Sequence, residues 1–565
     1  MPRSTRRSFL SGVLAAASCW SRAARPQTSA RRPAGRTDTR QSSIDAERER
    51  IVRAMAQADI PGAAVCWLDE GEPRWVEAFG TTDRHTNHPA RADTLFSIQS
   101  TSKNFTATAI MLAVQRGMLD LDEPVTTYLP EFTVQSRFEP MPQAKMTLRL
   151  LLAHRAGFTH EAPVGNNYDP AFPSFEAHVR SISQTWLRYP VGERYRYSNL
   201  GFDLAGYILQ RRSGVPFADW LKVMVFEPLG MNDSTAASAV YMKAANRAVG
   251  HEEGYVVVPL ETPLIPSGGV YSSGRDMAAY CRFHINRGKV DGRTVLKEEL
   301  WREMHAFPYG GDYSLGVIRT ELRHGSTDIR LMSHRGGGFG FGSVFDYCPE
   351  AGLGWVALFN RPASAAYRFG EQLIDRALAR RFGPRKPRRP LEDMAPVTLS
   401  ATSLHSYVGN YVGRNVTVDI ATGQRSLLMR DRGTSSDVRF LSPTKLFVVD
   451  PDGDTLVYDY YAGSPLEPAH LECFIGENSL DYNQGPYDAL GPDKPAWTGH
   501  VGAYRIYQWG KAVDSVTVHV QNGYLYLNQF RLIIETESGL FFTCDGEAVD
   551  FRGGSPTWKN IRLHR

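Results

Sequence analysis

Ser100 and Lys103 stand three residues apart at the start of an apolar, helix-patterned run, in the stretch LFSIQSTSKNFTATAIML (residues 95–112). Residues i and i+3 of a helix share a face, so this hydroxyl and this amine could meet at the first turn. A serine hydroxyl becomes a good nucleophile when a base takes its proton, and a lysine can be that base when burial or nearby cations lower its pKa. The spacing therefore predicts an activated serine. A helix-capping serine followed by a solvated lysine is the alternative.

Tyr197 and Asn199 form a second candidate pair, in RYRYSNLGFDLAGYIL (residues 194–209). Positions i and i+2 of an extended segment point to the same side, so the phenol and the amide could face one cleft. The tyrosine could relay a proton to a leaving group, and the amide could hold a substrate carbonyl. The alternative is a core tyrosine followed by a capping asparagine.

His334 opens a third candidate, the glycine-rich passage in DIRLMSHRGGGFGFGSVFDY (residues 328–347), which lies between two β-like runs. Glycines have no Cβ, so a ligand could lie against this strand, and a backbone N–H there could form half of an oxyanion hole. The other half would be the N–H of Ser100, at a helix start that favours negative charge. A flexible hairpin with a surface histidine is the alternative.

Each short pattern also occurs elsewhere by chance. SPTK (residues 442–445) repeats the serine–lysine spacing, but Pro443 and the following β-run exclude a helix, and YLN (residues 526–528) lies within a predicted strand. The chain has no G-x-S-x-G elbow, no phosphate-binding P-loop, no H-E-x-x-H and no G-x-G-x-x-G. These absences disfavour metal and nucleotide chemistry.

The order S-x-x-K, Y-x-N, H-x-G resembles the serine β-lactamase and penicillin-binding-protein-like family, in its class C and D-aminopeptidase branch. The resemblance covers about residues 45–380 and extends to the text around the motifs, namely GMLDLDEPVTTYLPEF, MTLRLLLAHRAGF, FEPLGMNDS and SGGVYSSGRDMAAY. It implies an α+β fold, with an antiparallel sheet flanked by helices. It also implies a serine hydrolase that needs no cofactor and no metal.

Position by position, the resemblance implies that Ser100 is the acylated nucleophile and that Lys103 and Tyr197 transfer the proton. Asn199 would touch the substrate amide. His334 would be the first residue of the third motif.

Gly336 and Gly337 would line the substrate, and the N–H of Gly337 would be the second oxyanion donor beside that of Ser100. The chain departs here from β-lactamases, which usually have K-T-G. Their lysine offers a cation to the carboxylate of a β-lactam, whereas histidine is largely neutral near pH 7, and we expect Arg335 to point away from the cleft. A dedicated β-lactamase is therefore disfavoured.

Length and composition indicate several soluble domains. The chain has 565 residues, of which 42% are apolar and 22% charged, and no uncharged run is long enough for a membrane span. Its formal charge is +4, and loss of the five arginines before residue 26 lowers the 64 basic residues to 59, against 60 acidic ones. This near-equality of basic and acidic residues does not indicate binding to nucleic acid.

The N-terminus resembles an export signal. Residues 1–25 combine a basic start, the Arg6-Arg7 pair in STRRSFL and a short alanine-rich apolar stretch, as in a twin-arginine signal peptide. The alternative is a disordered basic tail. The sequence does not decide how this segment is processed: it could be cleaved at the small residues near Ala17, or Cys19 could be lipidated. Residues 26–44 are polar and predict a linker, so the fold is expected to begin at Asp45.

The last third of the chain has a different character. Pro and Arg accumulate in residues 381–400, which predicts an exposed linker; a nucleic-acid arm is less plausible in an exported protein. Alternating runs around Asp452-Gly453 and Asn522-Gly523 predict hairpins. SLHSYVGNYVG and WTGHVGAYRIY share Val-Gly-x-Tyr, so we predict two β-barrels, residues 401–492 and 493–565, similar to the barrels of D-aminopeptidases. One larger β-domain is the alternative.

The sequence thus predicts a periplasmic or secreted serine hydrolase that releases N-terminal D-amino acids from small peptides or amides. The alternatives are a carboxylesterase, a β-lactamase or DD-carboxypeptidase, and a non-catalytic penicillin-binding sensor. The expected partner is a small-molecule or peptide substrate, and a homodimer is considered. An acidic group on an inward barrel loop would recognise a substrate amine, but the sequence does not identify it.

Overall fold

The computed structural model describes residues 39–565 with several gaps. The residues outside the description are 169–171, 253–262, 387–396, 414–416, 424–425, 432–433, 450–454, 464–468, 476–477, 485–493, 522, 529, 533 and 544. The predicted signal peptide and most of the two predicted linkers lie outside the described residues. So do the central residues of both predicted hairpin turns, Asp452-Gly453 and Asn522.

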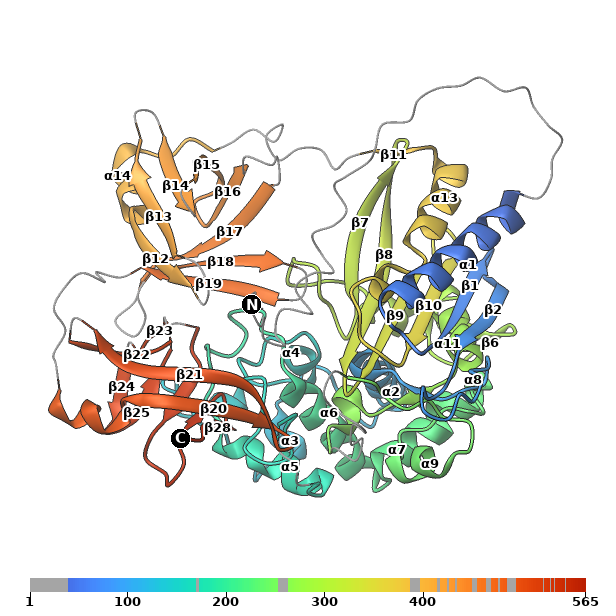
Figure 1. The fold of residues 1–565 in the computed structure, drawn as a ribbon, viewed down its shortest axis with the longest axis horizontal. Coiled ribbons are helices and arrows are strands. Elements are labelled where there is room, and N and C mark those ends of the chain that lie inside the picture. Colours follow the sequence, from blue (N-terminus) through green and yellow to red (C-terminus); the bar gives the residue numbers. More distant parts are fainter. Residues whose placement is uncertain are drawn as a thin grey trace, which may run out of the picture.

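A seven-stranded antiparallel sheet forms the centre of the first domain (Figure 1). Its strands, in spatial order, are β11 (Arg385–Lys386), β7 (Ile318–His324), β8 (Thr327–Gly338), β9 (Phe341–Cys348), β10 (Leu353–Phe359), β1 (Gly62–Asp69) and β2 (Glu72–Gly80). Strand β1 is buried along its whole length. Its alternate residues Ala64, Cys66 and Leu68 join one hydrophobic cluster, while Ala63, Val65 and Trp67 join another, because successive side chains of a strand point to opposite faces.

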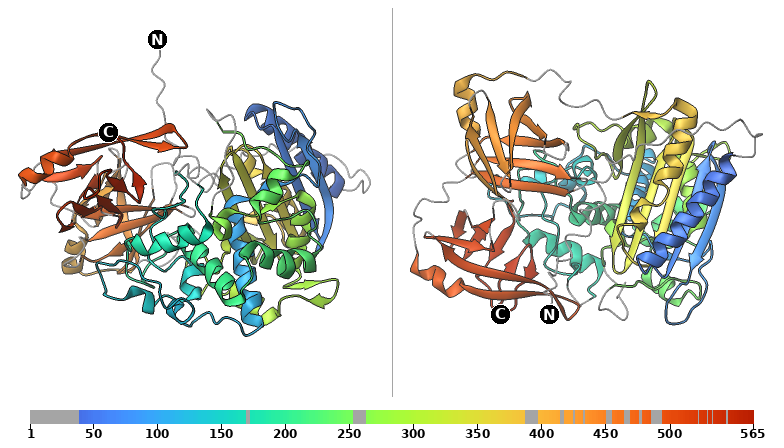
Figure 2. Two further views of the ribbon diagram at one scale, coloured as in Figure 1. Left: turned by 90° about the horizontal axis from the view of Figure 1, so that it is seen from below. Right: turned by 45° about the horizontal axis from the view of Figure 1, so that its top comes forward.

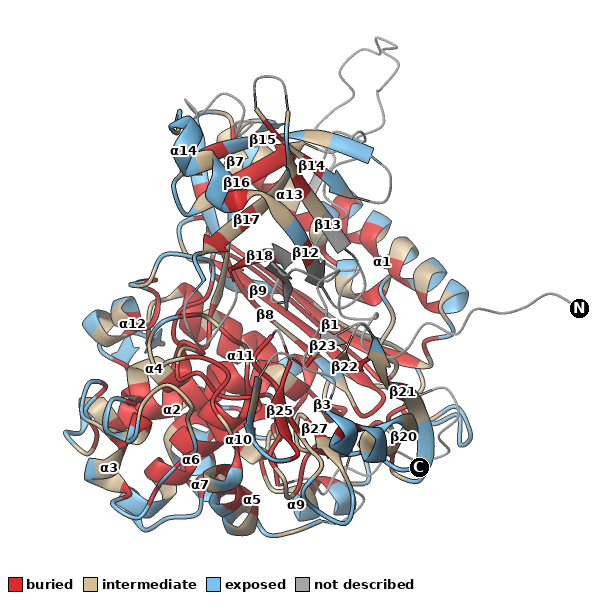
Figure 3. Ribbon diagram, turned by 90° about the vertical axis from the view of Figure 1, so that its left-hand side faces the viewer, coloured by how far each residue is buried: buried red, intermediate tan, exposed pale blue. Residues whose placement is uncertain are grey.

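Helices cover both faces of this sheet. On one face lie α1 (Thr39–Gln57) and α13 (Glu371–Phe382), which contact each other (Figure 2). The other face carries α11 (Gly274–Ile285), beside the central helix α2 (Ser102–Gln115) and α6 (Asn199–Ser213). Figure 3 shows that α2, α10 and α11 are largely buried.

Shorter elements complete this domain. The 3-10 turns are η3 (Gln99–Thr101), η4 (Pro142–Ala144), η5 (Ile182–Gln184) and η7 (Ala366–Arg368), and η6 (Lys222–Phe226) is a π-helical turn. The short helices are α3 (Val125–Tyr128), α4 (Leu148–Leu152), α5 (Phe175–Ser181), α7 (Phe217–Leu221), α8 (Glu227–Leu229), α9 (Ser238–Lys243), α10 (Ile265–Gly268) and α12 (Glu298–Met304). Two small ribbons pair β3 (Phe96–Ser97) with β4 (Tyr271–Ser272) and β5 (Lys289–Val290) with β6 (Arg293–Thr294).

The chain enters its fold earlier than Asp45. Helix α1 begins at Thr39, within the stretch predicted as a linker, and Ile44 is buried against the sheet. Of the four linker residues whose burial is described, Gln41 and Ser42 are exposed, whereas Ser43 and Ile44 are buried. Within the described residues, no helix is long and apolar enough to cross a membrane.

A closed antiparallel barrel follows, which confirms the first predicted barrel. Its strands are β12 (Gly409–Gly413), β13 (Thr417–Thr422), β14 (Leu427–Asp431), β15 (Thr434–Ser442), β16 (Lys445–Val449), β17 (Thr455–Tyr461), β18 (His470–Ile475) and β19 (Asn478–Gln484), preceded by α14 (Ala401–Leu404) and η9 (His405–Tyr407). Strand β19 pairs with β12 and closes the ring. The chance motif at Ser442–Lys445 lies between β15 and β16 and is not helical, which confirms the exclusion of a helix there.

The second β-unit differs from the predicted single barrel. After η10 (Pro495–His500), its described strands form a four-stranded sheet of β20 (Gly502–Gln508), β21 (Lys511–Gln521), β22 (Tyr524–Leu527) and β23 (Phe530–Arg531). A five-stranded sheet contains β24 (Ile534–Glu537), β25 (Leu540–Phe542), β26 (Ala548–Asp550), β27 (Thr557–Trp558) and β28 (Ile561–Arg562). Both sheets contribute to one core, and a bridge joins Arg505 to His564. At each seam one strand, β23 or β28, is only two residues long, which is too short to extend the ladder from one sheet to the other among the described residues.

Both C-terminal units lie on the same side of the first domain. In Figure 1, helices α3, α4 and α5 lie between the second unit and the large sheet, and the barrel lies above the second unit. The two units therefore pack against the helical part of the domain that also supplies α6 and the N-terminal part of α2.

Candidate active site

Lys103 lies at the start of α2 and is fully buried, with 0% of its surface exposed. Its Nζ is 3.2 Å from Ser100 Oγ, 2.8 Å from Asn199 Oδ1 and 2.8 Å from the backbone oxygen of Ser267. Ser100 itself belongs to the 3-10 turn η3 that leads into α2. The predicted meeting of the serine and the lysine across one helical turn is therefore present.

The contacts of Lys103 Nζ with three oxygens suit a base. A neutral amine has two N–H groups and one lone pair, and the Asn199 and Ser267 oxygens accept hydrogen bonds only. When the two N–H groups of a neutral Lys103 donate to these oxygens, its lone pair can accept the hydroxyl proton of Ser100. After that transfer the ammonium would donate to all three oxygens.

The ring of Tyr197 also lies close to this amine. The centroid of its ring is 4.8 Å from Lys103 Nζ, and the ring of Phe202 lies at 5.8 Å. Asn199 is the first residue of α6, and the preceding Ser198 caps that helix by accepting from the N–H of Leu200. Because Ser198 supplies the cap, the side chain of Asn199 is available to Lys103, which excludes the capping alternative.

A buried polar network holds the carbonyl that Lys103 contacts. Asp203 accepts hydrogen bonds of 3.0 Å from both the N–H and the hydroxyl of Ser267. Its carboxylate also lies 3.2 Å from Nε2 of His178, and both side chains are fully buried. Burial lowers the pKa of His178, but the hydrogen bond and charge of Asp203 outweigh it and raise the pKa overall. The network thus fixes the Ser267 carbonyl against the lysine.

His334 lies on β8 and is fully buried. Its Nδ1 lies 2.9 Å from the backbone oxygen of Arg335, so Nδ1 donates, and Nε2 then accepts from the hydroxyl of Tyr313 at 3.0 Å. Burial, with the nearby charge of Lys103, lowers the pKa of His334 to about 3. The third motif therefore presents no positive charge from this side chain at neutral pH.

Arg335 does not replace that charge, because it forms an ion pair with Asp346 of the neighbouring strand β9. This pairing agrees with the expectation that Arg335 points away from the cleft.

Gly336 and Gly337 bring β8 against the nucleophile turn. A Cβ on Gly336 would lie 2.1 Å from the backbone oxygen of Ile98 and 2.5 Å from Ser343 Oγ, and one on Gly337 would lie 2.5 Å from the hydroxyl of Tyr367. These glycines are thus required by protein neighbours on the two faces of the strand, whereas the sequence had suggested only the approach of a ligand. Pairing of β7 with β8 stops at Ser333, so the edge of β8 beyond it is not covered by β7.

Two further side chains at the site were not predicted from the sequence. The ring of His154 lies 4.3 Å from that of Tyr197 and 4.6 Å from that of Tyr313, measured between centroids. His154 Nδ1 accepts from the N–H of Ser198 at 3.2 Å, and burial lowers the pKa of His154 well below its ordinary value. His154 stands in the quoted stretch MTLRLLLAHRAGF, but Tyr313 carries no local signal.

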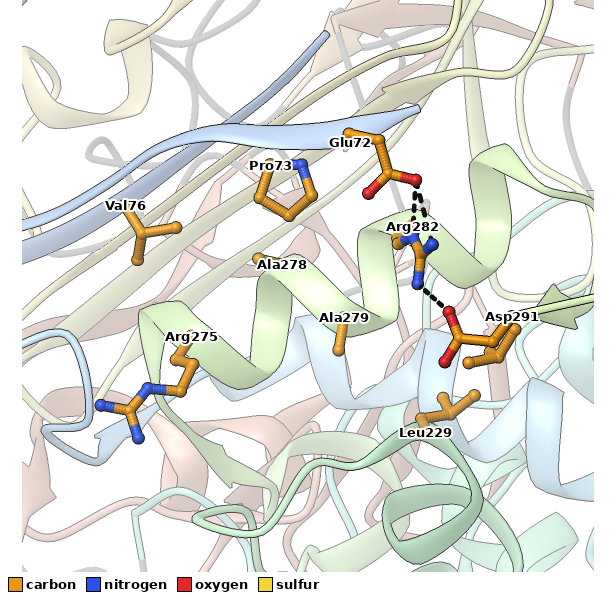
Figure 4. A pocket seen from close by; sticks show the side chains of 10 residues that line it. Glu72, Pro73, Val76, Leu229, Arg275, Ala278, Ala279, Arg282 and Asp291 are labelled. Atoms are coloured by element: carbon orange, nitrogen blue, oxygen red, sulfur yellow. Dashed lines mark hydrogen bonds and ion pairs between the residues drawn. The ribbon is translucent and has the colours of Figure 1, made fainter. Parts of the chain in front are cut away.

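A separate hollow of about 360 Å³ lies between the start of β2 and α11 (Figure 4). Its Arg282 pairs with both Glu72 and Asp291. None of the predicted site residues lines this hollow, and its charged groups neutralise one another. It is not a candidate for the chemistry.

The comparisons with known proteins agree with this geometry. Residues 48–379 match the Beta-lactamase family. The chain is 31% identical over 198 residues to esterase EstB of Burkholderia gladioli, a match that covers 33% of this chain and half the length of EstB. It is 27% identical over 315 residues to the D-alanyl-D-alanine-carboxypeptidase/endopeptidase AmpH of Escherichia coli K12, covering 53% of this chain and 79% of AmpH.

Among solved structures, SurE resembles this chain with a TM-score of 0.56 and 21% identity, over 79% of this chain and 99% of SurE. The structure of SurE with D-Leu gives a TM-score of 0.54. The chain belongs to the beta-lactamase family, whose members are serine hydrolases that include esterases and carboxypeptidases.

Proposed function

We propose that this protein hydrolyses small peptides or amides through an acyl-enzyme on Ser100 and releases N-terminal D-amino acids. The observation that carries the mechanism is the contact of a fully buried Lys103 with Ser100 Oγ, Asn199 Oδ1 and the Ser267 carbonyl. Lys103 takes the hydroxyl proton, and Tyr197 passes a proton to the leaving group. The N–H groups of Ser100 and Gly337 stabilise the oxyanion, and water then releases the acyl group.

The third motif supports a substrate without a carboxylate at that position. His334 is neutral and Arg335 is engaged by Asp346, so neither offers the free cation that a β-lactam carboxylate would use. The preference for D-residues is supported by the family resemblance, by the similarity to AmpH, a D-alanyl-D-alanine-carboxypeptidase/endopeptidase, and by the similarity to the structure of SurE with D-Leu. A β-lactamase or DD-carboxypeptidase is accordingly a weaker proposal.

Among the described residues, the acidic groups that the C-terminal units bring to the first domain do not favour an amine site of their own. Glu472 pairs with Arg196, and Asp545 and Glu547 share Arg188. The hydroxyls of Thr543 and Thr159 also donate to Asp545 and Glu547, so protein donors already occupy these three carboxylates.

An esterase is the second candidate, because EstB is the relative with the highest identity among those compared above and because an ester needs no amine recognition. The deciding experiment is a panel on one purified sample: D- and L-alanine p-nitroanilide, p-nitrophenyl acetate and butyrate, and a chromogenic cephalosporin, each with Ser100→Ala beside the wild type. We expect turnover of the D-anilide that Ser100→Ala abolishes. Turnover of the L-anilide alone would overturn the substrate proposal, and turnover of the esters alone would favour the esterase.

A penicillin-binding sensor gives a different result. Intact-mass spectrometry after a fluorescent penicillin would then find a persistent adduct on Ser100 without turnover of any member of the panel.

We further propose export by the twin-arginine route, on the sequence of residues 1–25. Replacing Arg6 and Arg7 together with lysine should retain the protein in the cytoplasm of an expressing bacterium, as measured by fractionation. Unchanged export would contradict this route. The homodimer stays a prediction.

A further inference from the structure

The segment Arg194–Tyr197 alternates between two environments. Tyr195 and Tyr197 face the site, with ring centroids 5.8 Å and 4.3 Å from that of His154. Arg194 and Arg196 are buried on the other side, against the closed barrel. This is the i, i+2 alternation of an extended segment, with tyrosines towards the chemistry and arginines towards the neighbouring domain.

Strand β18 of the barrel offers a matching pair of side chains. Arg196 forms an ion pair with Glu472, and Arg194 contacts the ring of His470, so residues two apart on one segment meet residues two apart on the other. The exposed fractions of the Arg196 and Glu472 side chains are 2% and 0%. Their neighbours Leu471 and Cys473 belong to the core of the barrel, so this face of β18 is turned outward to the first domain.

The second β-unit is linked through Thr159 to Ser198, the residue that follows Tyr197. Thr159 donates from its hydroxyl to Glu547 at 2.6 Å, and its backbone oxygen accepts from the hydroxyl of Ser198 at 2.6 Å. Glu547 is buried and lies 3.2 Å from Arg188. Ser198 follows Tyr197 directly, so the second unit reaches the segment one residue beyond the tyrosine.

Tyr189 joins the two attachments. Its hydroxyl accepts from Arg196 at 3.1 Å and donates to the backbone oxygen of Asp545 at 3.1 Å. The guanidinium carbons of Arg194 and Arg196 lie 4.3 Å and 4.5 Å from its ring centroid. The barrel and the second unit therefore both contact the stretch of the first domain from Tyr189 to Ser198.

We infer that the two C-terminal units position Tyr197: Glu472 of the barrel holds Arg196, and Glu547 of the second unit holds Ser198 through Thr159. Glu472 and Glu547 are positioning residues, because they act through the neighbours of Tyr197 and touch no reacting atom. The inference rests on the proposed role of Tyr197 in proton transfer. In this inference the two C-terminal units support catalysis by positioning Tyr197, and they need not contact the substrate.

The test is a double-mutant cycle in the full-length protein. Glu472→Gln and Thr159→Val, which retain side-chain size, are made alone and together with Tyr197→Phe. Glu535→Gln is the matched control, because it removes an ion pair with Lys494 that lies wholly within the second unit. Rates on the best substrate of the panel are divided by the titre of active Ser100, so that partial unfolding does not count as lost catalysis.

We expect Glu472→Gln and Thr159→Val each to lower kcat on the order of tenfold to a hundredfold, with KM changed less than about threefold, since small misplacements of a catalytic group cost rates of this size. In the Tyr197→Phe background the same changes should have almost no further effect. Glu535→Gln should leave kcat unchanged. Because Thr159→Val removes no charge, it keeps the test valid if Glu472→Gln does not fold.

Two outcomes overturn the inference. In one, both variants keep the wild-type kcat per active site while Tyr197→Phe is impaired. In the other, their losses multiply with that of Tyr197→Phe, as expected for a purely structural role. If instead Tyr197→Phe is fully active while Ser100→Ala is inactive, the proposed role of Tyr197 fails, and with it the basis of the inference.

Discussion

Lys103 donates a 2.8 Å hydrogen bond to the side-chain carbonyl of Asn199, and this contact fixes the amide of Asn199 as well as the amine. Because the oxygen of the amide is taken by the lysine, its NH₂ group is the part left to donate to a substrate carbonyl. In the proposed mechanism one side chain thus both supports the base and contacts the substrate.

Replacing Asn199 by aspartate tests this double role. A carboxylate 2.8 Å from Nζ would hold the ammonium protonated to higher pH, so we expect Asn199→Asp to lower kcat by on the order of 10²-fold at pH 7. The acidic limb of the pH–rate profile should move to higher pH. Asn199→Ala, which adds no charge, should lose activity without moving that limb. An unshifted limb in Asn199→Asp would contradict the assignment of Lys103 as base.

The contact of β8 with the nucleophile turn predicts a steric effect. In Gly336→Ala the new Cβ would lie 2.1 Å from the carbonyl oxygen of Ile98, so strand and turn must separate. We expect a loss of unfolding free energy of about 1–3 kcal/mol and a larger proportional loss of kcat. At Gly499 an added Cβ meets nothing within 4 Å, so Gly499→Ala is the matched control for urea unfolding and activity. Equal stability of the two variants would show that the close approach is not required.

Tyr313 is expected to keep His334 in its neutral, oriented form. Tyr313→Phe removes the hydroxyl that donates to His334 Nε2 at 3.0 Å and leaves the ring against His154. Loss of one donor to a buried acceptor should cost about 1–3 kcal/mol of stability and lower kcat several-fold. Thermal unfolding and kcat measured together check this. The contact has no role in catalysis if kcat per active site is unchanged.

Acid sensitivity should arise from buried neutral histidines. Burial lowers the pKa of His305 to about 4 and outweighs the hydrogen bond that its Nδ1 donates to the oxygen of Trp301. Its Nε2 accepts from the hydroxyl of Tyr347, which suits the neutral ring. Between about pH 6.5 and pH 4 the unfolded chain binds a proton at this residue that the folded chain does not, so stability falls as pH falls through this window. Each such group contributes up to about 1.4 kcal/mol per pH unit.

His305→Gln should therefore flatten the dependence of unfolding free energy on pH between 4 and 6.5 by up to that slope, measured by urea unfolding at several pH values. The neighbouring His284, whose pKa burial also lowers, keeps its own contribution in this variant. An unchanged slope would mean that His305 is protonated in the folded protein.

Much of the site follows from local patterns in the sequence. The i, i+3 spacing of Ser100 and Lys103 and the i, i+2 spacing of Tyr197 and Asn199 are geometric rules of helices and extended segments, and the structure brings these four residues together. The helix-patterned run in residues 95–112 is likewise present in α2, which begins at Ser102. Local periodicity is sufficient for these elements.

The remainder depends on contacts between distant parts of the chain. Tyr313 reaches His334 only because β7 and β8 pair, and Asp203 reaches Ser267 only because α6 packs on α10. The i, i+2 rule places Tyr197 and Asn199 on one side, but Glu472, the partner of Arg196 in the barrel, lies 276 residues further along the chain. No local rule connects such residues. The division of the second β-unit into two sheets likewise depends on strands of two residues that carry no periodic signal.

The most direct test of the central claim is the acylation of Ser100 with and without Lys103. A burst of p-nitrophenol from p-nitrophenyl acetate, with the acetyl group located by mass spectrometry of the digested protein, measures this step in the wild type, Ser100→Ala and Lys103→Met. The account predicts acetylation at Ser100 in the wild type, none in Ser100→Ala and a burst rate at least about 10²-fold slower in Lys103→Met. A wild-type burst rate in Lys103→Met, or acetylation at another residue, would contradict it.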